Sequence, residues 1–353
     1  MPSSPSYALR LALTLAAGTL AAIACERLRV PLPWMIGPLV VTAAGCMAGT
    51  PLAAATVLRN AGQWAIGTAL GLYFTPQVVG LVVSLAPAIG VGIVWALLLG
   101  AGFGAFLRWA NPRIAGLDAP TVFFASAIGG ASEMAVLAER HGGRLDLVAS
   151  AHSLRILIVV VVVPFGLQLA GLHGLDPSVP GPREVHAGGL AALAGLTLAS
   201  GLAMHRLRLA NAWMMGPLAA AFALTASGIE LSALPGAVAN AAQLFIGVAL
   251  GVRFTPAFLH TAPRWLATVG VGTLLMIVLS AAYALAIARW SGLHPATVLL
   301  GTSPGGIAEM CITAKVLELG VPVVTAFHVT RLAAVVMLAG PLFRWRAAAS
   351  PRG

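Results

Sequence analysis

The sequence predicts an all-α, polytopic membrane protein made of two homologous repeats. Hydrophobic residues fill 59% of the 353 positions, charged residues only 8%, and the mean hydropathy is +0.95. This is more apolar surface than a soluble core can enclose. Apolar stretches that approach or reach the length of a membrane span recur along the chain, and three blocks of the first half return in the second.

The apolar segments, taken in order, define the expected helices. Six have, or approach, the length of a full span: residues 11–25, 78–107, 156–172, 188–203, 266–288 and 321–343. Six are shorter: residues 34–48, 61–74, 120–138, 213–227, 237–252 and 296–317. We therefore predict about 10–12 transmembrane segments, some of them half-helices or re-entrant elements.

The first segment resembles a signal peptide, because Arg10 precedes an alanine- and leucine-rich run that ends at Cys25. Residues 188–203 hold the corresponding place in the second half and cannot be removed by N-terminal cleavage, so we expect a retained helix. Cys25, Cys46 and Cys311 have no CxxC spacing. We expect them to pack as small hydrophobic side chains, with neither a disulfide nor a metal.

The repeat is visible in blocks of equal spacing. Residues 34–39 (Trp-Met-Ile-Gly-Pro-Leu) match residues 213–218 (Trp-Met-Met-Gly-Pro-Leu), residues 74–76 match 254–256, and residues 125–134 match 301–310. We predict a first membrane repeat at residues 1–175 and a second at 176–353, joined by a proline- and glycine-rich linker near residues 174–183. Six complete spans in each half make the repeats parallel, whereas five spans and a re-entrant element make them inverted.

The formal charge of +10 comes from arginines scattered at the ends of the apolar segments. Proteins that bind nucleic acid usually carry their basic residues in one concentrated stripe. We therefore expect these scattered arginines to contact membrane lipid and not nucleic acid. The arginines of the C-terminal residues favour a cytoplasmic C-terminus.

Each half carries one apolar segment with a helix-breaking centre. Gly129 and Gly130 interrupt residues 120–138, and Pro304, Gly305 and Gly306 interrupt residues 296–317. Irregular backbone at membrane depth is tolerated only against protein or a water-filled cavity. We therefore expect a broken helix, and a cavity, in each half.

Glu133 and Glu309 follow the glycine pairs by three residues, in the first turn of the second half-helix. There, backbone N–H groups and the helix dipole stabilise a carboxylate, which suits reversible protonation or binding of a monovalent cation. The alternative is a capping glutamate, or one paired with Arg155 or Arg331. Ser132 and Ser303 are expected as neutral ligands of a transported solute or ion, or as helix-packing residues.

Two further sets of polar residues recur. His152 and Arg155, like His328 and Arg331, are three residues apart on one helix face. They tune the charge of the glutamates or, alternatively, lie near a helix end with the arginine reaching the headgroups. Gln63 and Gln243 are expected in helix–helix hydrogen bonds or, alternatively, in contact with the substrate.

Residues 33–38 and 129–134, with His152, Arg155 and the second-half copies, resemble the AbrB membrane protein family. This duplicated bacterial family is distinct from the soluble DNA-binding regulator of the same name. The resemblance implies a multi-pass protein of the cell inner membrane and a distant similarity to cation/proton antiporters and bile-acid symporters, whose crossing broken helices hold the transport site. The family names also refer to regulation of gene expression and to ammonia monooxygenase.

Three classes of function follow. An ammonia-oxidising enzyme needs clustered metal ligands, yet the eight histidines show no HxH or HxxxH pair. A direct regulator needs a soluble DNA-reading module, for which no hydrophilic stretch is long enough. We therefore predict an ion-coupled secondary transporter of a small solute, with no cofactor, no metal and no enzymatic activity. An indirect effect on gene expression is the alternative.

Overall fold

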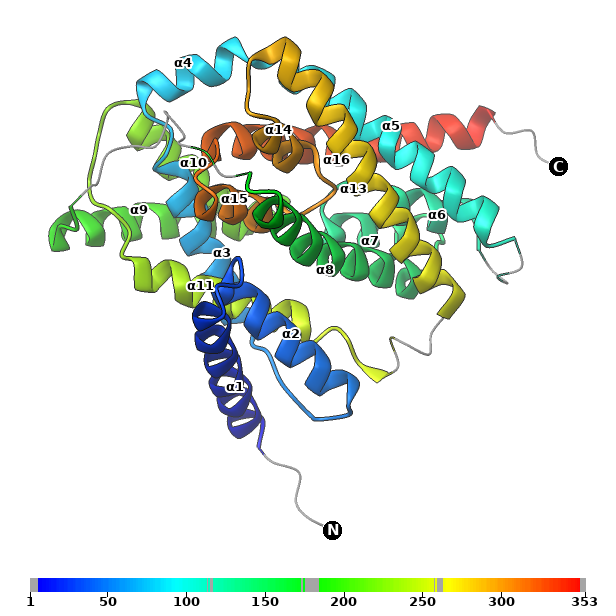
Figure 1. Cartoon of the computed structure of the whole chain (residues 1–353), viewed down its shortest axis with the longest axis horizontal. Helices are drawn as coiled ribbons and strands as arrows, with labels where there is room; N and C mark the ends of the chain where they lie inside the picture. Colours follow the sequence, from blue (N-terminus) through cyan, green and yellow to red (C-terminus); the bar gives the residue numbers. More distant parts are fainter. Residues whose placement is uncertain are drawn as a thin grey trace. The chain divides into compact units, whose positions relative to one another are not determined.

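The computed structural model describes residues 6–112, 114, 117–172, 174, 184–256, 258 and 263–349, and these residues form helices without a strand (Figure 1). Six of the helices are long and apolar enough to cross a membrane. They are α1 (Tyr7–Arg27), α5 (Ala86–Ala110), α8 (Leu145–Leu169), α9 (Ala187–Arg206), α13 (Pro263–Ser291) and α16 (Val321–Ala349). The predicted all-α fold is confirmed, and the chain is a multi-pass membrane protein.

Shorter helices fill the places of the shorter apolar segments. They are α2 (Pro33–Met47), α3 (Thr56–Gly71), α4 (Pro76–Ser84), α10 (Ala212–Ala226) and α11 (Gly236–Gly251). Two broken segments complete the set, one formed by α6 (Ala119–Ser126) and α7 (Ala131–Arg140), the other by α14 (Pro295–Thr302) and α15 (Ile307–Val316). The predicted linker lies almost entirely outside the described residues, and the repeat boundaries remain a prediction.

Two helix boundaries differ from the sequence-based expectation. The apolar run at residues 78–107 contains two helices, because α5 starts anew after Leu85 with Pro87 in its first turn, where proline is favoured. Helix α8 begins at Leu145, well before the apolar run at residues 156–172. The apolar run begins only after Arg155, because the charged side chain of this residue interrupts the hydrophobic sequence. In the structure, Arg155 lies within the helix.

The chain forms two compact units. The first unit consists of Met1–Val83, Pro164–Leu259 and Cys311–Pro322, and the second unit of Ser84–Val163, His260–Met310 and Val323–Gly353. Each unit therefore combines segments from both halves of the sequence, and neither coincides with one predicted repeat.

In the first unit, close helix crossings pair segments from the two halves. Helix α3 packs against α10, and α2 against α11. A Cβ at Gly67 would overlap the carbonyl oxygen of Met214 on α10, and one at Gly247 would lie 2.5 Å from the carbonyl oxygen of Met35 on α2. Without a side chain, these glycines let two backbones touch, as in many transmembrane helix pairs.

The second unit contains both breaks, together with α6, α7, α14 and the first turn of α15. Helix α5 packs against α6 and α13, and α13 against α14. Trp95 of α5 stacks on Tyr283 of α13 with ring centroids 4.4 Å apart. The fully buried Trp265 donates its indole N–H to the carbonyl oxygen of Leu147 over 3.1 Å, which fixes the start of α8 against α13.

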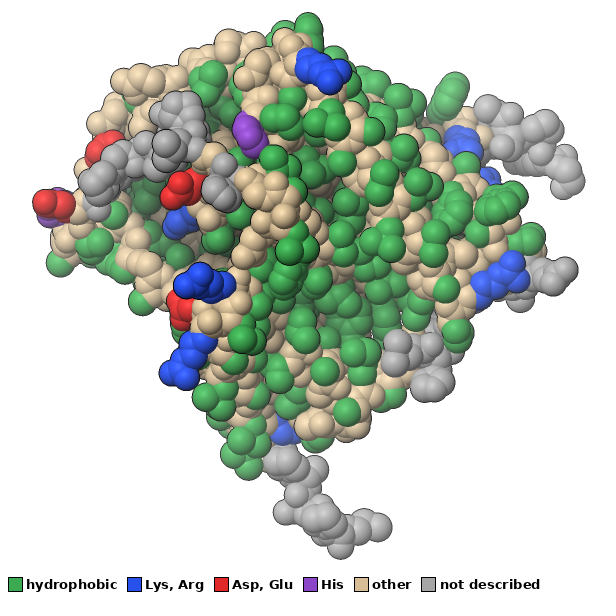
Figure 2. All heavy atoms as spheres, viewed as in Figure 1, with side chains coloured by type: hydrophobic (Ala, Val, Ile, Leu, Met, Phe, Trp, Pro, Cys, Tyr) green, Lys and Arg blue, Asp and Glu red, His purple; other side chains and the backbone are tan. Residues whose placement is uncertain are grey.

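Hydrophobic side chains are spread across the face shown in Figure 2, with few charged side chains among them. Large aliphatic residues of the long helices are exposed, among them Leu20, Leu98 and Val278, each more than 60% accessible. A soluble protein rarely exposes contiguous apolar surface on this scale. Contact with lipid acyl chains explains it.

The crossing of α3 and α10 predicts that Gly67→Ala destabilises the protein. The added methyl group meets backbone that cannot move aside, and overpacking of this kind costs about 1–3 kcal/mol. Gly195→Ala in α9 is the control, because nothing lies within 4 Å of its Cβ position. We expect a lower melting temperature in detergent for Gly67→Ala only. Equal melting temperatures for both variants would contradict the close crossing.

Candidate functional site

Both broken segments end and restart as the sequence predicts. Helix α6 stops at Ser126 with Ala127 as its C-cap, and α7 restarts after Gly130. Helix α14 stops at Thr302 with Ser303 as its C-cap, and α15 restarts at Ile307. Each break exposes carbonyl groups at the end of one half-helix and N–H groups at the start of the next. In an apolar environment these groups require partners.

Arginine side chains satisfy the carbonyl groups. Arg155 Nη2 donates to the carbonyl oxygen of Ala127 over 3.0 Å, and Arg331 Nη1 donates to that of Ser303 over 2.6 Å. Arg331 also donates through Nη2 to the carbonyl oxygen of Gly305, over 2.8 Å. A cation at a helix C-terminus is further stabilised by the helix dipole. Each arginine therefore completes the end of a half-helix.

The histidines belong to the same arrangement. His152 Nε2 lies 2.9 Å from the carbonyl oxygen of Phe124, and His328 Nε2 lies 2.8 Å from that of Leu300. On the other side of each ring, Nδ1 lies 2.8 Å from Nη2 of Arg155 or Arg331. Because a guanidinium can only donate, Nδ1 accepts and Nε2 carries the proton. Both imidazoles are therefore neutral.

These four side chains lie in the protein interior. Arg155 is 2% and Arg331 6% exposed, and the two histidines are 1% and 0% exposed. The arginines therefore do not reach the headgroups, which was the alternative interpretation of their sequence position. The charge of Arg331 also acts on Arg155. The carbonyl oxygens around the breaks offset the cost of burying two like charges near each other.

The glutamates occupy the opposite side of each break. Glu133 is the third residue of α7 and Glu309 the third of α15. Their Oε2 atoms occupy the space that a side chain on Gly130 or Gly306 would fill. From this position, the acid of a capping box reaches back to the N-terminal N–H of its helix. A side chain at either position would displace the carboxylate from its place over the backbone.

Each break also contacts the long helix of the other half. A Cβ at Gly129 would lie 2.9 Å from Val335 Cγ1 of α16, and a Cβ at Gly305 would lie 2.9 Å from Val159 Cγ1 of α8. His152 and Arg155 of α8 bind the first break, and Val159 contacts the second. The same reciprocal relation holds for α16. The two breaks therefore share the helices α8 and α16.

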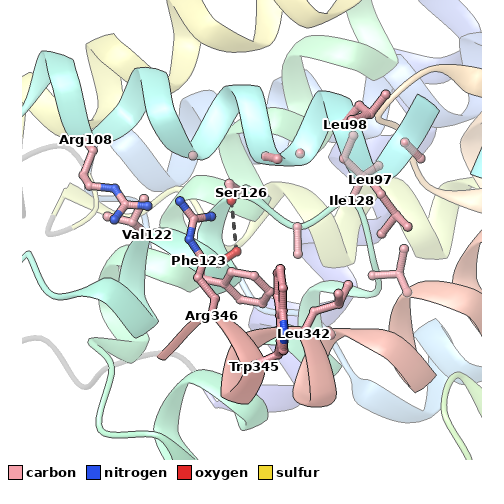
Figure 3. A pocket seen from close by; sticks show the side chains of 17 residues that line it. Leu97, Leu98, Arg108, Val122, Phe123, Ser126, Ile128, Leu342, Trp345 and Arg346 are labelled. Atoms are coloured by element: carbon pink, nitrogen blue, oxygen red, sulfur yellow. Dashed lines mark hydrogen bonds between the residues drawn. The ribbon is translucent and has the colours of Figure 1, made fainter. Parts of the chain in front are cut away.

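The two breaks differ in accessibility. Glu309 is buried, whereas Glu133 is half-buried, and Ser132 beside it is exposed. Ser303 is buried and donates its hydroxyl to the carbonyl oxygen of Leu299 over 2.6 Å. A cavity of about 290 Å³ touches the first break at Ser126, Ala127 and Ile128 (Figure 3). An apolar cavity thus lies beside this break, and a water-filled cavity at either break stays a prediction.

The glutamines are placed elsewhere. Gln63 lies in α3 and Gln243 in α11, both in the first unit, whereas the breaks belong to the second. Gln63 Nε2 donates to Oδ1 of Asn211, the residue that precedes α10, over 3.3 Å. This is the helix–helix contact that the sequence allowed. A substrate contact for either glutamine stays a prediction.

The described part of the chain contains neither a cluster of metal-ligating side chains nor a disulfide. Its residues contain no group of three or more His, Cys, Asp or Glu placed to hold a metal ion. All three cysteines are free thiols, two of them buried.

Sequence reasoning missed the partners of the histidines and arginines. The backbone carbonyl groups were not expected as partners, and the predicted influence of these residues on the charge of the glutamates stays a prediction. One signal was present in the sequence: His152 and His328 follow the first glycine of the break, Gly129 or Gly305, by the same number of residues. An equal separation in two copies indicates a fixed contact between the break and the following helix.

The family described as "Transition state regulatory protein AbrB" matches residues 34–347, from α2 to α16 and across both breaks. The chain belongs to the AbrB family. Its relatives include "Uncharacterized protein YhjN" of Bacillus subtilis (strain 168), 24% identical over 89% of this chain and 87% of the relative. Another is "Putative regulator AbrB" of Escherichia coli (strain K12), 24% identical over 88% of this chain and 89% of the relative.

In this AbrB-family protein, Arg155→Lys and Arg331→Lys are expected to loosen the breaks. Lysine keeps the charge but lacks the planar fork that contacts a carbonyl group and a histidine at once. A buried acceptor left unpaired costs about 1–3 kcal/mol. Hydrogen exchange should accelerate at the amides of residues 127–131 and 303–307, respectively. Arg289→Lys, at the end of α13, is the control, and unchanged exchange in the break variants would contradict the assigned contacts.

The neutral histidines of the AbrB-family protein give a separate spectroscopic prediction. Nitrogen-15 NMR of labelled histidine should show protonated Nε2 and unprotonated Nδ1 for His152 and His328, assigned through His152→Asn and His328→Asn. A doubly protonated ring would exclude the hydrogen bond from arginine and contradict this geometry.

Proposed function

We propose that this AbrB-family protein is an ion-coupled secondary transporter of a small solute in the bacterial inner membrane. The observation that carries the proposal is the pair of equivalent broken helices, each with a glutamate at the start of its second half-helix. Broken helices of this kind place helix ends, and their partial charges, at membrane depth. Helix ends provide sites for ions and for charged groups of a solute.

The glutamates are the groups best able to change charge at the breaks. Arginine remains protonated under all physiological conditions. Each histidine is held neutral between an arginine and a carbonyl oxygen. Protonation of Glu133 or Glu309, or binding of a monovalent cation to one of them, changes the charge of a break without dismantling these contacts. We therefore assign ion coupling to the two carboxylates.

The different exposure of the glutamates supports alternating use. Glu133 is half-buried and Glu309 buried, although both occupy the same position in their half-helices. A transporter exposes its site to one side of the membrane at a time. The two breaks then carry the same chemical groups, but in one conformation their glutamates differ in accessibility to water.

Regulation of gene expression is a second candidate, supported by the family description and by the name of the Escherichia coli relative. We propose that such an effect of this chain is indirect and follows from the solute that it transports. We also propose that the protein is not an enzyme, since transport explains both carboxylates without a reaction. Stoichiometric copper or iron in the purified protein would support an ammonia monooxygenase instead.

Glu133→Gln and Glu309→Gln test the proposal. The solute is first identified by comparing metabolite uptake in a deletion strain and in the complemented parent. In reconstituted vesicles, each variant should then lose at least 90% of proton- or sodium-driven flux, about a tenfold effect, since neutral glutamine cannot exchange an ion. Glu139→Gln in α7 and Glu318→Gln after α15 are exposed controls and should keep normal flux.

The glutamine variants also separate transport from helix capping. Glutamine at this position of a capping box still accepts the backbone hydrogen bond, so the variants should fold normally. Glu133→Ala and Glu309→Ala remove both roles and should also lower the melting temperature. Full coupled flux in both glutamine variants, with reduced stability in the alanine variants, would assign the glutamates to capping alone and refute the proposal.

A further inference from the structure

The cavity beside the first break is apolar over most of its length. It lies between α5, α6 and α16 and has a volume of about 290 Å³, near the lower limit of typical small-ligand pockets of about 300–1,000 Å³. Leu97, Val122, Phe123, Ile128 and Leu342 contribute side chains to its wall (Figure 3). The hydroxyl group of Ser126 donates to the carbonyl oxygen of Phe123 over 3.0 Å and is therefore not available as a donor to an occupant.

Two arginines define one end of the cavity. Arg108 in the last turn of α5 and Arg346 in the last turn of α16 both line it, and Figure 3 shows both guanidinium groups on the same side of the cavity. Within the described residues, neither guanidinium forms a salt bridge to an acidic side chain. An anion between them would accept charge-assisted hydrogen bonds from both guanidinium groups.

The rim of the cavity consists of lipid-facing surface. Leu98 is 62% and Trp345 73% exposed, and both line the cavity. They belong to α5 and α16, two of the six helices able to cross the membrane. An acyl chain can therefore enter sideways from the bilayer, whereas a water-borne solute would have to cross an apolar rim. Tryptophan and arginine at the ends of spans are also typical of the headgroup region.

We propose that this cavity binds an anionic phospholipid, with its headgroup phosphate between Arg108 and Arg346 and one acyl chain along the apolar wall. The occupant combines a negative charge with a hydrocarbon tail, which matches the lining of the cavity from one end to the other. Basic pockets between transmembrane helices recognise anionic headgroups in this way. This site is separate from the transport proposed for the two glutamates and does not depend on it.

The acyl chain would lie directly against the first break. Ala127 and Ile128 line the cavity, and the carbonyl oxygen of Ala127 accepts the hydrogen bond from Arg155. A bound chain thus fills the space beside the irregular backbone. The lipid would support the break at the residue whose carbonyl group Arg155 binds.

Quenching of Trp345 by brominated lipids tests the proposal in the intact protein. Two vesicle preparations are compared, one with brominated phosphatidylglycerol and one with the same fraction of brominated phosphatidylcholine. Because Trp345 also faces bulk lipid, the measured quantity is the ratio of quenching by the anionic to the zwitterionic lipid. We expect a ratio well above one in the wild type. Trp345→Phe should remove this excess, which assigns it to the cavity among the eight tryptophans.

Variants of the cavity separate the headgroup from the acyl-chain contribution. Arg108→Gln with Arg346→Gln should lower the ratio to about one, whereas Arg108→Lys with Arg346→Lys should retain most of it. Ala101→Phe fills the cavity from α5, leaves both arginines in place and should lower the ratio as well. Arg289→Gln, at the end of α13, is the control and should leave the ratio unchanged.

Glycerol phosphate distinguishes a lipid from a soluble anion of the same chemistry. An excess of glycerol phosphate should leave the ratio unchanged, because it lacks the acyl chain. Relief of the excess quenching by glycerol phosphate would show that the arginines bind a soluble phosphate, and would overturn the proposal. A wild-type ratio of about one, or an unchanged ratio in both the glutamine and the Ala101→Phe variants, would overturn it too.

Discussion

The structure depends on satisfying the backbone at two helix breaks in an apolar environment. Four half-helices end inside the protein, and each end carries unpaired polar groups and a partial charge. Arg155 and Arg331, each with its histidine, supply donors for the carbonyl ends. Glu133 and Glu309 lie at the opposite N–H ends. The buried charged residues of the second unit thus follow from the irregular backbone that they stabilise.

The sequence predicted those features that depend on local chemistry. Hydrophobicity and length identified the helices, and the pairs Gly129-Gly130 and Gly305-Gly306 identified the breaks with a glutamate in the next turn. The partners of Arg155 could not be predicted in the same way, because a carbonyl group has no signature in the sequence. The apolar run at residues 156–172 also excluded this arginine from its helix, since hydrophobicity alone does not show that a buried charge is satisfied.

The charges of the breaks connect structure and proposed mechanism. Two guanidinium groups carry a constant positive charge, and two imidazoles are held neutral by their hydrogen bonds. In the proposed mechanism, the two carboxylates bind a proton or a cation. In this mechanism, one residue position in each half both caps a helix and changes charge. Such a double role explains why the carboxylate lies directly over a glycine. The change in charge occurs where the backbone is already irregular and held by side chains of α8 and α16.

Infrared difference spectroscopy of the purified protein tests the central claim most directly, because it requires no knowledge of the solute. The protein carries carbon-13 in its glutamate carboxyl groups and is compared at two pH values. If the two glutamates exchange protons, a carboxylic acid band should appear on acidification and be lost in the Glu133→Gln, Glu309→Gln double variant. An identical difference spectrum for the wild type and the double variant would show that these glutamates do not exchange protons. Sodium binding would then be the remaining form of coupling, and titration with sodium should shift the carboxylate bands of the wild type only. Absence of both responses would contradict the account.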